Sequence, residues 1–329
     1  METLTKKRSF AELLASDKFI VSAELTPPRH FDTTKFMEAA GIVSEYVDVV
    51  QLNDHLLSRA RLSNLVAGMH CKNAGLEPIL QFTLRHRNRI ALQGDLLGFA
   101  NLGLENVIIL GGYPCAIGTD PEARDATDLG SVEAIASITA LTREGKMFNG
   151  DVIKPAPKFT VGTIDFPCAT DKIEDSMKRL TDKIDAGAKY IQVQAIFELG
   201  PMQFWMAEVV RRGLHKRARF LAAIFPFSWA ECLHVLREIP GLSICWPAWE
   251  VVTVRAEACL PRSSLSTVSA KLRVFRACSS APWGPRAGRC ASSRLPAWAA
   301  SWCTSGGPTN SPLFNGARMQ GHVWHSQRP

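Results

Sequence analysis

The sequence lacks the features that mark membrane spans, secretion signals and metal sites. No apolar run reaches the roughly 18 residues that a membrane-spanning helix needs. The first eight residues, Met1 to Arg8, are polar and no hydrophobic segment follows them, which argues against secretion. The nine cysteines form no CxxC pair, so we expect neither a zinc ribbon nor a disulfide framework. These absences predict a cytoplasmic protein without a membrane segment.

The chain has an excess of positive charge that is confined to its C-terminal part. The formal net charge is +7. Residues 247–329 hold ten Lys and Arg against two Glu, a net of +8, which leaves 28 basic and 29 acidic side chains, a net of −1, in residues 1–246. Residues 1–246 are nearly neutral and therefore lack the excess of positive charge that is typical of nucleic-acid-binding proteins. We therefore expect no nucleic-acid binding by the folded part.

The character of the sequence changes after Trp246. Six of the eight tryptophans lie from Trp246 onward, among many Ser, Arg, Pro, Ala and Cys residues. No helical or alternating apolar pattern is sustained there, and recurrent proline disfavours helices and central strands. We interpret residues 247–329 as an atypical, mostly irregular segment that arises from an out-of-frame translation or a replaced end. A divergent second domain is the alternative interpretation.

The first 246 residues alternate apolar strand patterns with helical patterns. Strands are expected at 19–25, 46–52, 78–84, 106–110, 159–164, 190–197 and 219–227. Helices are expected after a short helical lead-in within 1–18, at 33–44, 58–74, 88–102, 131–144, 172–186, 201–212 and 228–238. Strict alternation predicts a parallel sheet covered by helices. The repeat of roughly 25–35 residues fits a (β/α)8 TIM barrel whose eighth βα unit is missing or replaced.

A doubly wound open sheet is the alternative fold, and the absence of G-x-G-x-x-G after the first strand disfavours it. We divide the chain into a barrel domain, 1–246, and the atypical segment 247–329. Because no eighth strand is recognisable, strands one and seven are expected to have no partner between them, which leaves two open edges.

Glu24 is the residue that most needs an explanation. It lies near the carboxyl end of the first strand, inside an apolar run that Pro27 and Pro28 terminate. Burying a charged carboxylate is costly, so Glu24 is either in a salt bridge or on an exposed edge, or it is kept protonated as a proton donor. In a parallel barrel the reacting groups lie at the carboxyl ends of the strands. His86 is the only histidine at these predicted strand ends, so no metal cluster is expected.

Two other strand ends are candidates for ligand binding. Gly111 and Gly112, before Tyr113, would let the backbone approach a planar ligand or a phosphate, although a plain tight turn is the alternative. The basic residues that follow the third strand would hold a phosphate or a carboxylate tail, or would simply form an exposed helix start; they are Arg85, Arg87 and Arg89.

Three motifs, in order along the chain, carry a family resemblance. They are Ser22-Ala23-Glu24-Leu25-Thr26-Pro27-Pro28, then Thr83 with Arg87-Asn88-Arg89-Ile90-Ala91-Leu92-Gln93, and Asp185-Ala186-Gly187-Ala188 before Gln194. Over residues 17–245 the chain resembles the short bacterial, flavin-dependent type of methylenetetrahydrofolate reductase. The resemblance implies a flavin-bearing barrel that reduces 5,10-methylenetetrahydrofolate to 5-methyltetrahydrofolate, in the one-carbon metabolism that serves methionine biosynthesis. It also implies FAD or FMN as cofactor, with NAD(P)H or another electron donor.

The resemblance assigns roles to individual residues. Glu24 matches the family's general acid, which would protonate N10 of the folate and open its five-membered ring to an iminium. Gln194 matches the glutamine that contacts the pterin, and Phe227 or Trp229 falls where the family places an aromatic side chain against the substrate. Thr83 and Lys183 match flavin-contact positions, and the remaining candidates for cofactor binding are Asn53, Arg87, Gly111, Gly112 and Tyr113.

One departure from the family bears on function. The family usually has Gly-Asp after the fourth strand, and here Gly112 or Tyr113 takes the place of the aspartate. Loss of that carboxylate is expected to weaken folate binding and to change the flavin potential, and it is compatible with a paralogue that acts on another one-carbon carrier. The alternative function is a non-catalytic or accessory folate-binding barrel that partners a methyltransferase. A homo-oligomer and an electron-donor subunit are further partners to expect, and a frame-disrupted copy that folds poorly is a third hypothesis.

Overall fold

The computed structural model describes residues 8–167, 170–196, 199–224 and 270–274. The expected helix at 228–238, the aromatic candidates Phe227 and Trp229, and all of the 247–329 segment except 270–274 lie outside the described residues.

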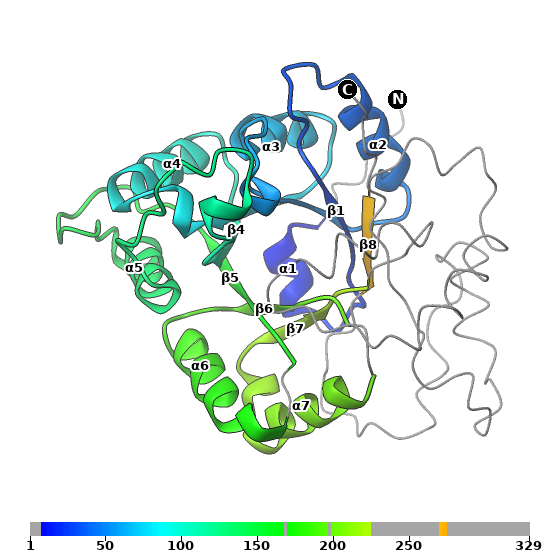
Figure 1. The fold of residues 1–329 in the computed structure, drawn as a ribbon, viewed down its shortest axis with the longest axis vertical. Coiled ribbons are helices and arrows are strands. Elements are labelled where there is room, and N and C mark those ends of the chain that lie inside the picture. Colours follow the sequence, from blue (N-terminus) through cyan, green and yellow to red (C-terminus); the bar gives the residue numbers. More distant parts are fainter. Residues whose placement is uncertain (1–7, 168–169, 197–198, 225–269, 275–329) are drawn as a thin grey trace, which may run out of the picture.

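A single curved sheet of eight strands forms the centre of the molecule (Figure 1). Seven neighbouring strands run parallel and follow one another in chain order, which confirms the predicted α/β fold of TIM-barrel type, here curled into a half-barrel. The strands are β1 (Val21–Leu25), β2 (Val49–Leu52), β3 (Pro78–Thr83), β4 (Asn106–Leu110), β5 (Thr160–Asp165), β6 (Tyr190–Val193), β7 (Arg219–Ala222) and β8 (Ala270–Val274).

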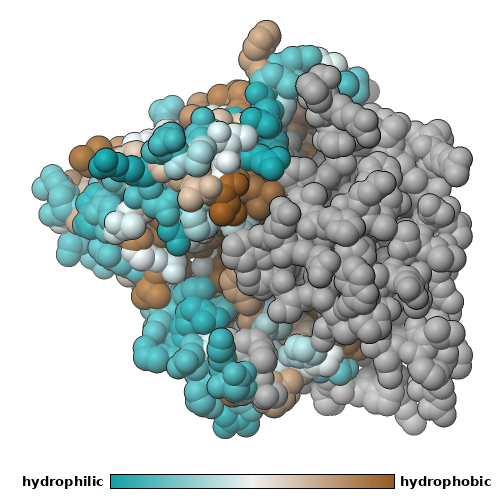
Figure 2. Space-filling model, viewed as in Figure 1, coloured by the Kyte–Doolittle hydropathy of each residue, from teal (hydrophilic) through white to brown (hydrophobic). Residues whose placement is uncertain are grey.

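Six helices cover the convex face of the sheet, and one short helix lies within its curve (Figure 1). The outer helices present mostly hydrophilic residues to the outside (Figure 2). None of the described helices is long and apolar enough to cross a membrane. The outer helices are α2 (Thr34–Ser44), α3 (Asn64–Asn73), α4 (Arg89–Asn101), α5 (Ser131–Glu144), α6 (Ile173–Asp185) and α7 (Leu199–Arg211), and the inner one is α1 (Phe10–Ala15).

The sheet separates two hydrophobic cores because side chains alternate between its faces. The larger core packs the outward side chains against helices, as with Phe82 and Phe99, whose rings lie 4.8 Å apart. The smaller core fills the barrel interior with Ile79, Ile108, Ile164, Tyr190 and Leu221 together with Phe10, Leu13 and Leu14 of α1. Helix α1 therefore closes the amino-terminal end of the barrel, and the carboxyl end is left for other residues.

Tyr190 is the central side chain of the inner core. Its ring meets Phe10 edge-on at 4.9 Å, and its hydroxyl donates a hydrogen bond to the Val107 carbonyl at 2.8 Å. A Cβ at Gly162 would lie 2.3 Å from the Tyr190 ring, so the glycine provides the space that the ring occupies. Burial raises the pKa of the Tyr190 hydroxyl well above its usual value.

Strand β8 corrects the expectation that the first strand has no partner on its outer edge. It pairs with β1 in an antiparallel ladder in which Ala23 lies opposite Leu272 and Glu24 opposite Lys271. The eighth unit is thus replaced by a strand of opposite direction. Among the described residues, no ladder joins β8 to β7.

Two elements begin three or more residues later than the sequence predicts. Strand β2 starts at Val49 because Asp48 is engaged elsewhere, accepting a hydrogen bond from the Val21 backbone N–H at 3.1 Å and pairing with Lys18. Helix α3 starts at Asn64, where the Ser63 side chain caps it by accepting from the Leu65 N–H at 3.3 Å. The residues before Ser63 form a turn that belongs to the candidate site.

Candidate functional site

Polar side chains line the inner face of β1 to β3 toward the carboxyl ends of these strands. Each strand carries two of them at a spacing of two residues, which places both on the same face. Gln51 donates a hydrogen bond from Nε2 to Ser22 Oγ at 3.0 Å. The set, each 6% exposed or less, comprises Ser22, Glu24, Gln51, Asn53, Gln81 and Thr83.

Glu24 lies at the centre of this polar layer and is 2% exposed. Its Oε2 accepts a hydrogen bond from Gln81 Nε2 at 2.9 Å, and its Oε1 accepts one from Asn53 Nδ2 at 3.3 Å. The same Asn53 amide donates to Thr26 Oγ1 at 2.8 Å. Glu24 is therefore a buried carboxyl group that two neighbouring strands hold in a fixed orientation, and it does not lie on an exposed edge.

Among the described residues, two buried side-chain oxygens on the inner face have no hydrogen-bond partner. They are Asn53 Oδ1 and Gln192 Oε1. Nearly all buried polar groups in proteins are hydrogen-bonded, so each open acceptor indicates a place for a donor group of a ligand. Gln194, two residues beyond Gln192, is half-buried and donates its backbone N–H to the Asp165 carbonyl at 2.9 Å.

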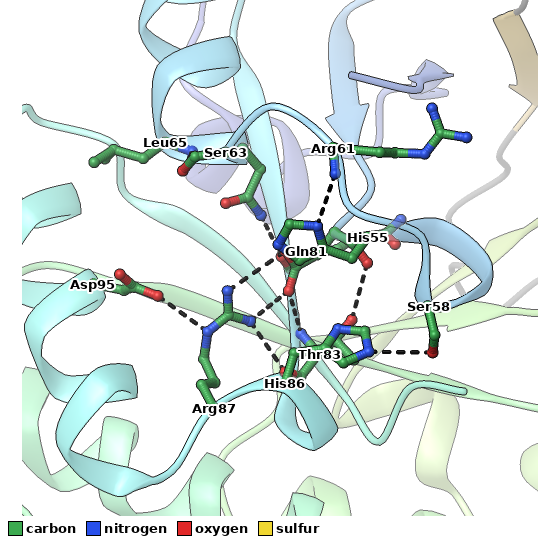
Figure 3. A network of polar contacts seen from close by, with 12 residues as sticks. His55, Ser58, Arg61, Ser63, Leu65, Gln81, Thr83, His86, Arg87 and Asp95 are labelled. Atoms are coloured by element: carbon green, nitrogen blue, oxygen red, sulfur yellow. Dashed lines mark hydrogen bonds and ion pairs between the residues drawn. The ribbon is translucent and has the colours of Figure 1, made fainter. Parts of the chain in front are cut away.

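A second polar network includes Thr83, Arg87 and Asp95 (Figure 3) and centres on Asp54, which directly follows β2. Asp54 accepts the Thr83 backbone N–H at 2.8 Å and pairs with Arg87, which also donates to Asp95 at 3.0 Å. Burial works against the charge of Arg87, but Asp54 and Asp95 outweigh it and raise the pKa of the guanidinium. Arg87 therefore ties β2, β3 and α4 together, and its charge is already balanced by two carboxylates.

The turn after β2 has an unusual backbone. His55, Leu57 and Ser58 have φ values of 43°, 57° and 51°, in the left-handed region that non-glycine residues seldom adopt. Ser58 holds the turn in place because its Oγ donates to the Tyr113 carbonyl at 2.8 Å and lies 3.2 Å from His86 Nε2. Burial lowers the pKa of His86. These contacts join the loops that follow β2, β3 and β4.

The two glycines after β4 differ in their surroundings. Gly112 has φ +85°, and a Cβ there would lie 2.0 Å from Thr83 Cγ2. A Cβ at Gly111 would have no atom within 4 Å. A side chain at position 112 would therefore crowd Thr83, whereas Gly111 has room for one.

The other charged candidates are paired with acids. Lys183 of α6 donates to the Ile164 carbonyl at 2.7 Å and pairs with Asp165 at 3.2 Å, on the outer side of β5. Burial lowers the pKa of Lys183, and Asp165 opposes that shift. In the same way Arg85 pairs with Asp125 at 2.6 Å, and Arg89 pairs with Asp128 at 2.9 Å.

Comparison with known proteins assigns the chain to a family. A model of the methylenetetrahydrofolate reductase family matches residues 9–255. The chain belongs to the methylenetetrahydrofolate reductase family. The match extends beyond residue 246, the boundary expected from the change in composition, by nine residues. No curated protein matches the chain.

Two solved structures resemble this reductase-family chain in fold. One, an uncharacterized protein from Clostridium thermocellum that binds two copies of 5-methyl-5,6,7,8-tetrahydrofolic acid, has a TM-score of 0.51 and 15% identity and covers 78% of this chain and 82% of its own. Another, from Aquifex aeolicus VF5, has a TM-score of 0.39 and 12% identity and covers 77% and 94%. At these identities the likeness concerns the fold.

Within the reductase-family site, the sequence motifs pointed to Glu24, Asn53 and Thr83, which the structure brings together at neighbouring strand ends. They missed Gln81, which orients Glu24, and Gln192, which leaves an acceptor open. The sequence feature that could have identified both glutamines is a polar residue at every second position of an otherwise apolar strand. In the described part of the chain no group of three metal-binding side chains occurs.

Proposed function

We propose that this chain binds a reduced folate at the carboxyl end of the half-barrel and reduces 5,10-methylenetetrahydrofolate to 5-methyltetrahydrofolate. The observation that carries the proposal is Glu24, a buried carboxyl whose two oxygens are held by Asn53 and Gln81 at the strand ends. Membership of the reductase family supports it. So does the folate bound by the structurally similar Clostridium thermocellum protein.

Glu24 supplies the proton in this proposal. It gives a proton to N10 of the folate, the bond between N10 and the bridging methylene breaks with its electron pair retained on N10, and the methylene remains on N5 as an iminium. Hydride addition to that carbon produces the methyl group. A positioned general acid of this kind contributes typically about 10²- to 10⁴-fold to the rate. The amides of Asn53 and Gln81 hold the carboxyl in one orientation.

The family is generally flavin-dependent, and the uncharged part of this site fits a planar ring system. Asn53 offers a buried acceptor without a partner, and Gly111 leaves open space beside the strand end. We propose that these residues, with the backbone of Gly112 and Tyr113 and the side chain of Thr83, hold the flavin ring. A bound flavin, FAD or FMN, supplies the hydride and is itself reduced by NAD(P)H or another donor. Arg87 and Lys183 already pair with carboxylates, so we assign them to supporting the strand ends.

An accessory folate-binding barrel that partners a methyltransferase is the second candidate. The glycine at position 111, where a carboxylate would have room, favours it. Both candidates are proposed as cytoplasmic, and both leave open a homo-oligomer or a complex with an electron-donor subunit.

Spectroscopy on the purified chain tests the proposal. We expect a flavin absorbance band that a reductant bleaches and that methylenetetrahydrofolate restores. Glu24→Gln should keep the band but lose about 10²- to 10⁴-fold in the rate of folate-dependent reoxidation, because it removes only the proton donor. Glu38→Gln, on the exposed side of α2, is the matched control and should behave as the unmodified chain.

Each failure has its own meaning. Normal turnover by Glu24→Gln would show that another group is the acid. Folate binding without any flavin band would refute the reductase and favour the accessory barrel.

A further inference from the structure

Three arginines lie on the loops that follow β1 and β2, at the carboxyl end of the half-barrel. They are Arg29, Arg59 and Arg61. Arg61 donates from Nη1 to the Pro27 carbonyl at 3.0 Å, and its backbone N–H donates to His55 Nδ1 at 3.2 Å. Figure 3 shows that the Arg61 guanidinium extends away from the network around Arg87. The arginine cluster thus has a surface separate from the paired charges described above.

The positive charge of Arg61 is not balanced by an acid. Within the described ranges no carboxylate lies at ion-pair distance from it, and its Nε is buried without a hydrogen-bond partner. Burial first, and then the charges of Arg29 and Arg59, lower the pKa of Arg61 to about 10. By contrast, the three arginines after β3 all have carboxylate partners. Keeping the charged Arg61 guanidinium half-buried beside Arg29 is unfavourable unless an anion binds there.

The cluster is adjacent to Glu24 along the chain. Pro27, whose carbonyl Arg61 holds, is three residues beyond Glu24, a reach of about 10 Å in extended chain. Thr26, between them, accepts the Asn53 amide that also contacts Glu24. An anion at Arg61 would therefore belong to a ligand whose other end reaches the candidate acid.

We propose that Arg61, with Arg29 beside it, binds the glutamate dicarboxylate of the folate whose N10 lies at Glu24. The inference rests on the proposed function. In a folate, one aromatic ring and one amide separate N10 from the glutamate, a length similar to the three residues of chain between Glu24 and Pro27. Guanidinium groups bind carboxylates through paired, charge-assisted hydrogen bonds, and a dicarboxylate offers one carboxylate to each of Arg29 and Arg61.

Calorimetric titration with two ligands tests this assignment on the full chain. The ligands are 5-methyltetrahydrofolate and the primary carboxamide of 5-methyltetrahydropteroate (the pteroate ligand below), which keeps the benzamide group and lacks only the glutamate carbons and their two carboxylates. We expect the unmodified chain to bind the folate roughly tenfold more tightly or better, the strength of a charged hydrogen bond. Arg29→Gln and Arg61→Gln should each remove most of that difference while leaving pteroate affinity unchanged.

Two further variants separate charge from folding. Arg61→Lys keeps the charge and should retain part of the preference for the folate. Arg143→Gln, an exposed arginine in the last turn of α5, should change neither affinity. Arg29 is exposed, so its variant reports on the anion even if Arg61→Gln disturbs the loop.

Three outcomes would overturn the inference. Equal affinity of the unmodified chain for the two ligands, or unchanged folate affinity in both glutamine variants, would remove the dicarboxylate site and leave the proposed function intact. Arg61-dependent binding of inorganic pyrophosphate that does not compete with the folate would assign the cluster to a phosphate group. Binding of neither pterin ligand would refute the proposed function itself.

Discussion

Gly111 and Gly112 are adjacent in sequence, yet the structure predicts opposite responses to an added methyl group. At Gly112 the backbone has φ +85° and the new Cβ would lie 2.0 Å from Thr83 Cγ2. The left-handed conformation costs a non-glycine residue roughly 1–2 kcal/mol, and overpacking costs about 1–3 kcal/mol. Gly112→Ala should therefore lower the unfolding free energy by about 2–5 kcal/mol, whereas Gly111→Ala should stay within about 0.5 kcal/mol of the unmodified chain.

Urea denaturation of four proteins resolves the two contributions at Gly112. Thr83→Ser removes Cγ2 but keeps the Oγ1 that donates to the Asp54 carbonyl at 3.2 Å. Combined with Gly112→Ala, Thr83→Ser should recover the part of the stability loss that comes from overpacking and leave the part that comes from the backbone. A double-mutant cycle measures the overpacking part as a coupling energy. Equal stability of Gly111→Ala and Gly112→Ala, or a coupling energy near zero, would refute the steric reasoning.

Three other predictions follow from buried contacts and from the C-terminal segment. Because the pKa of His86 is lowered in the folded chain, the unfolded chain takes up a proton first as the pH falls below about 6.5, which destabilises the fold. The urea midpoint should therefore drop more between pH 7.5 and pH 5.5 for the unmodified chain than for His86→Gln. Equal drops in the two proteins would contradict the assignment. Tyr190→Phe removes the bond to the Val107 carbonyl and should cost about 0.5–1.5 kcal/mol in urea unfolding, with no loss of flavin absorbance. Limited proteolysis should cut first within roughly 247–300 and leave a fragment that starts near residue 1, since that segment has no sustained apolar period; resistance of this segment to protease would refute the irregular structure that we predict for it.

The parallel part of the fold could be predicted because local patterns carry it. Apolar runs such as Val107-Ile108-Ile109 are bounded by glycine or proline, and their alternation with helical spacing dictates the sheet. The direction of β8 has no such signal. The alternation of side chains in a five-residue strand is the same for parallel and antiparallel pairing, so the direction depends on how the strand pairs with β1. The turn at His55 and Ser58 could not be predicted from the sequence either, because its left-handed backbone depends on contacts with the loops after β3 and β4.

The candidate site was predictable where a residue type conflicts with its surroundings. An acid inside an apolar strand demanded an explanation, and Glu24 proved to be buried and held by amides. An uncharged glutamine such as Gln81 is less unfavourable inside an apolar strand than an acid, so the sequence did not mark it as a site residue. The arginines after β3 were expected either to hold an anion or to form an exposed helix start, and Asp125 and Asp128, distant in the chain, neutralise two of them. Long-range pairing of this kind cannot be predicted from the local sequence.

The pairing of β1 with β8 has a consequence for the order of folding. β1 is among the first elements synthesised, and its partner on one edge lies about 245 residues later. At about 5–20 residues per second, the ribosome needs roughly 12–50 s to produce that partner. Closing a loop about ten times longer than the one between β1 and β2 also costs about 2 kcal/mol more in chain entropy. The edge beside Glu24 is therefore the last part of the described sheet to form, and a nascent chain exposes it to other strands until residues 270–274 have been synthesised.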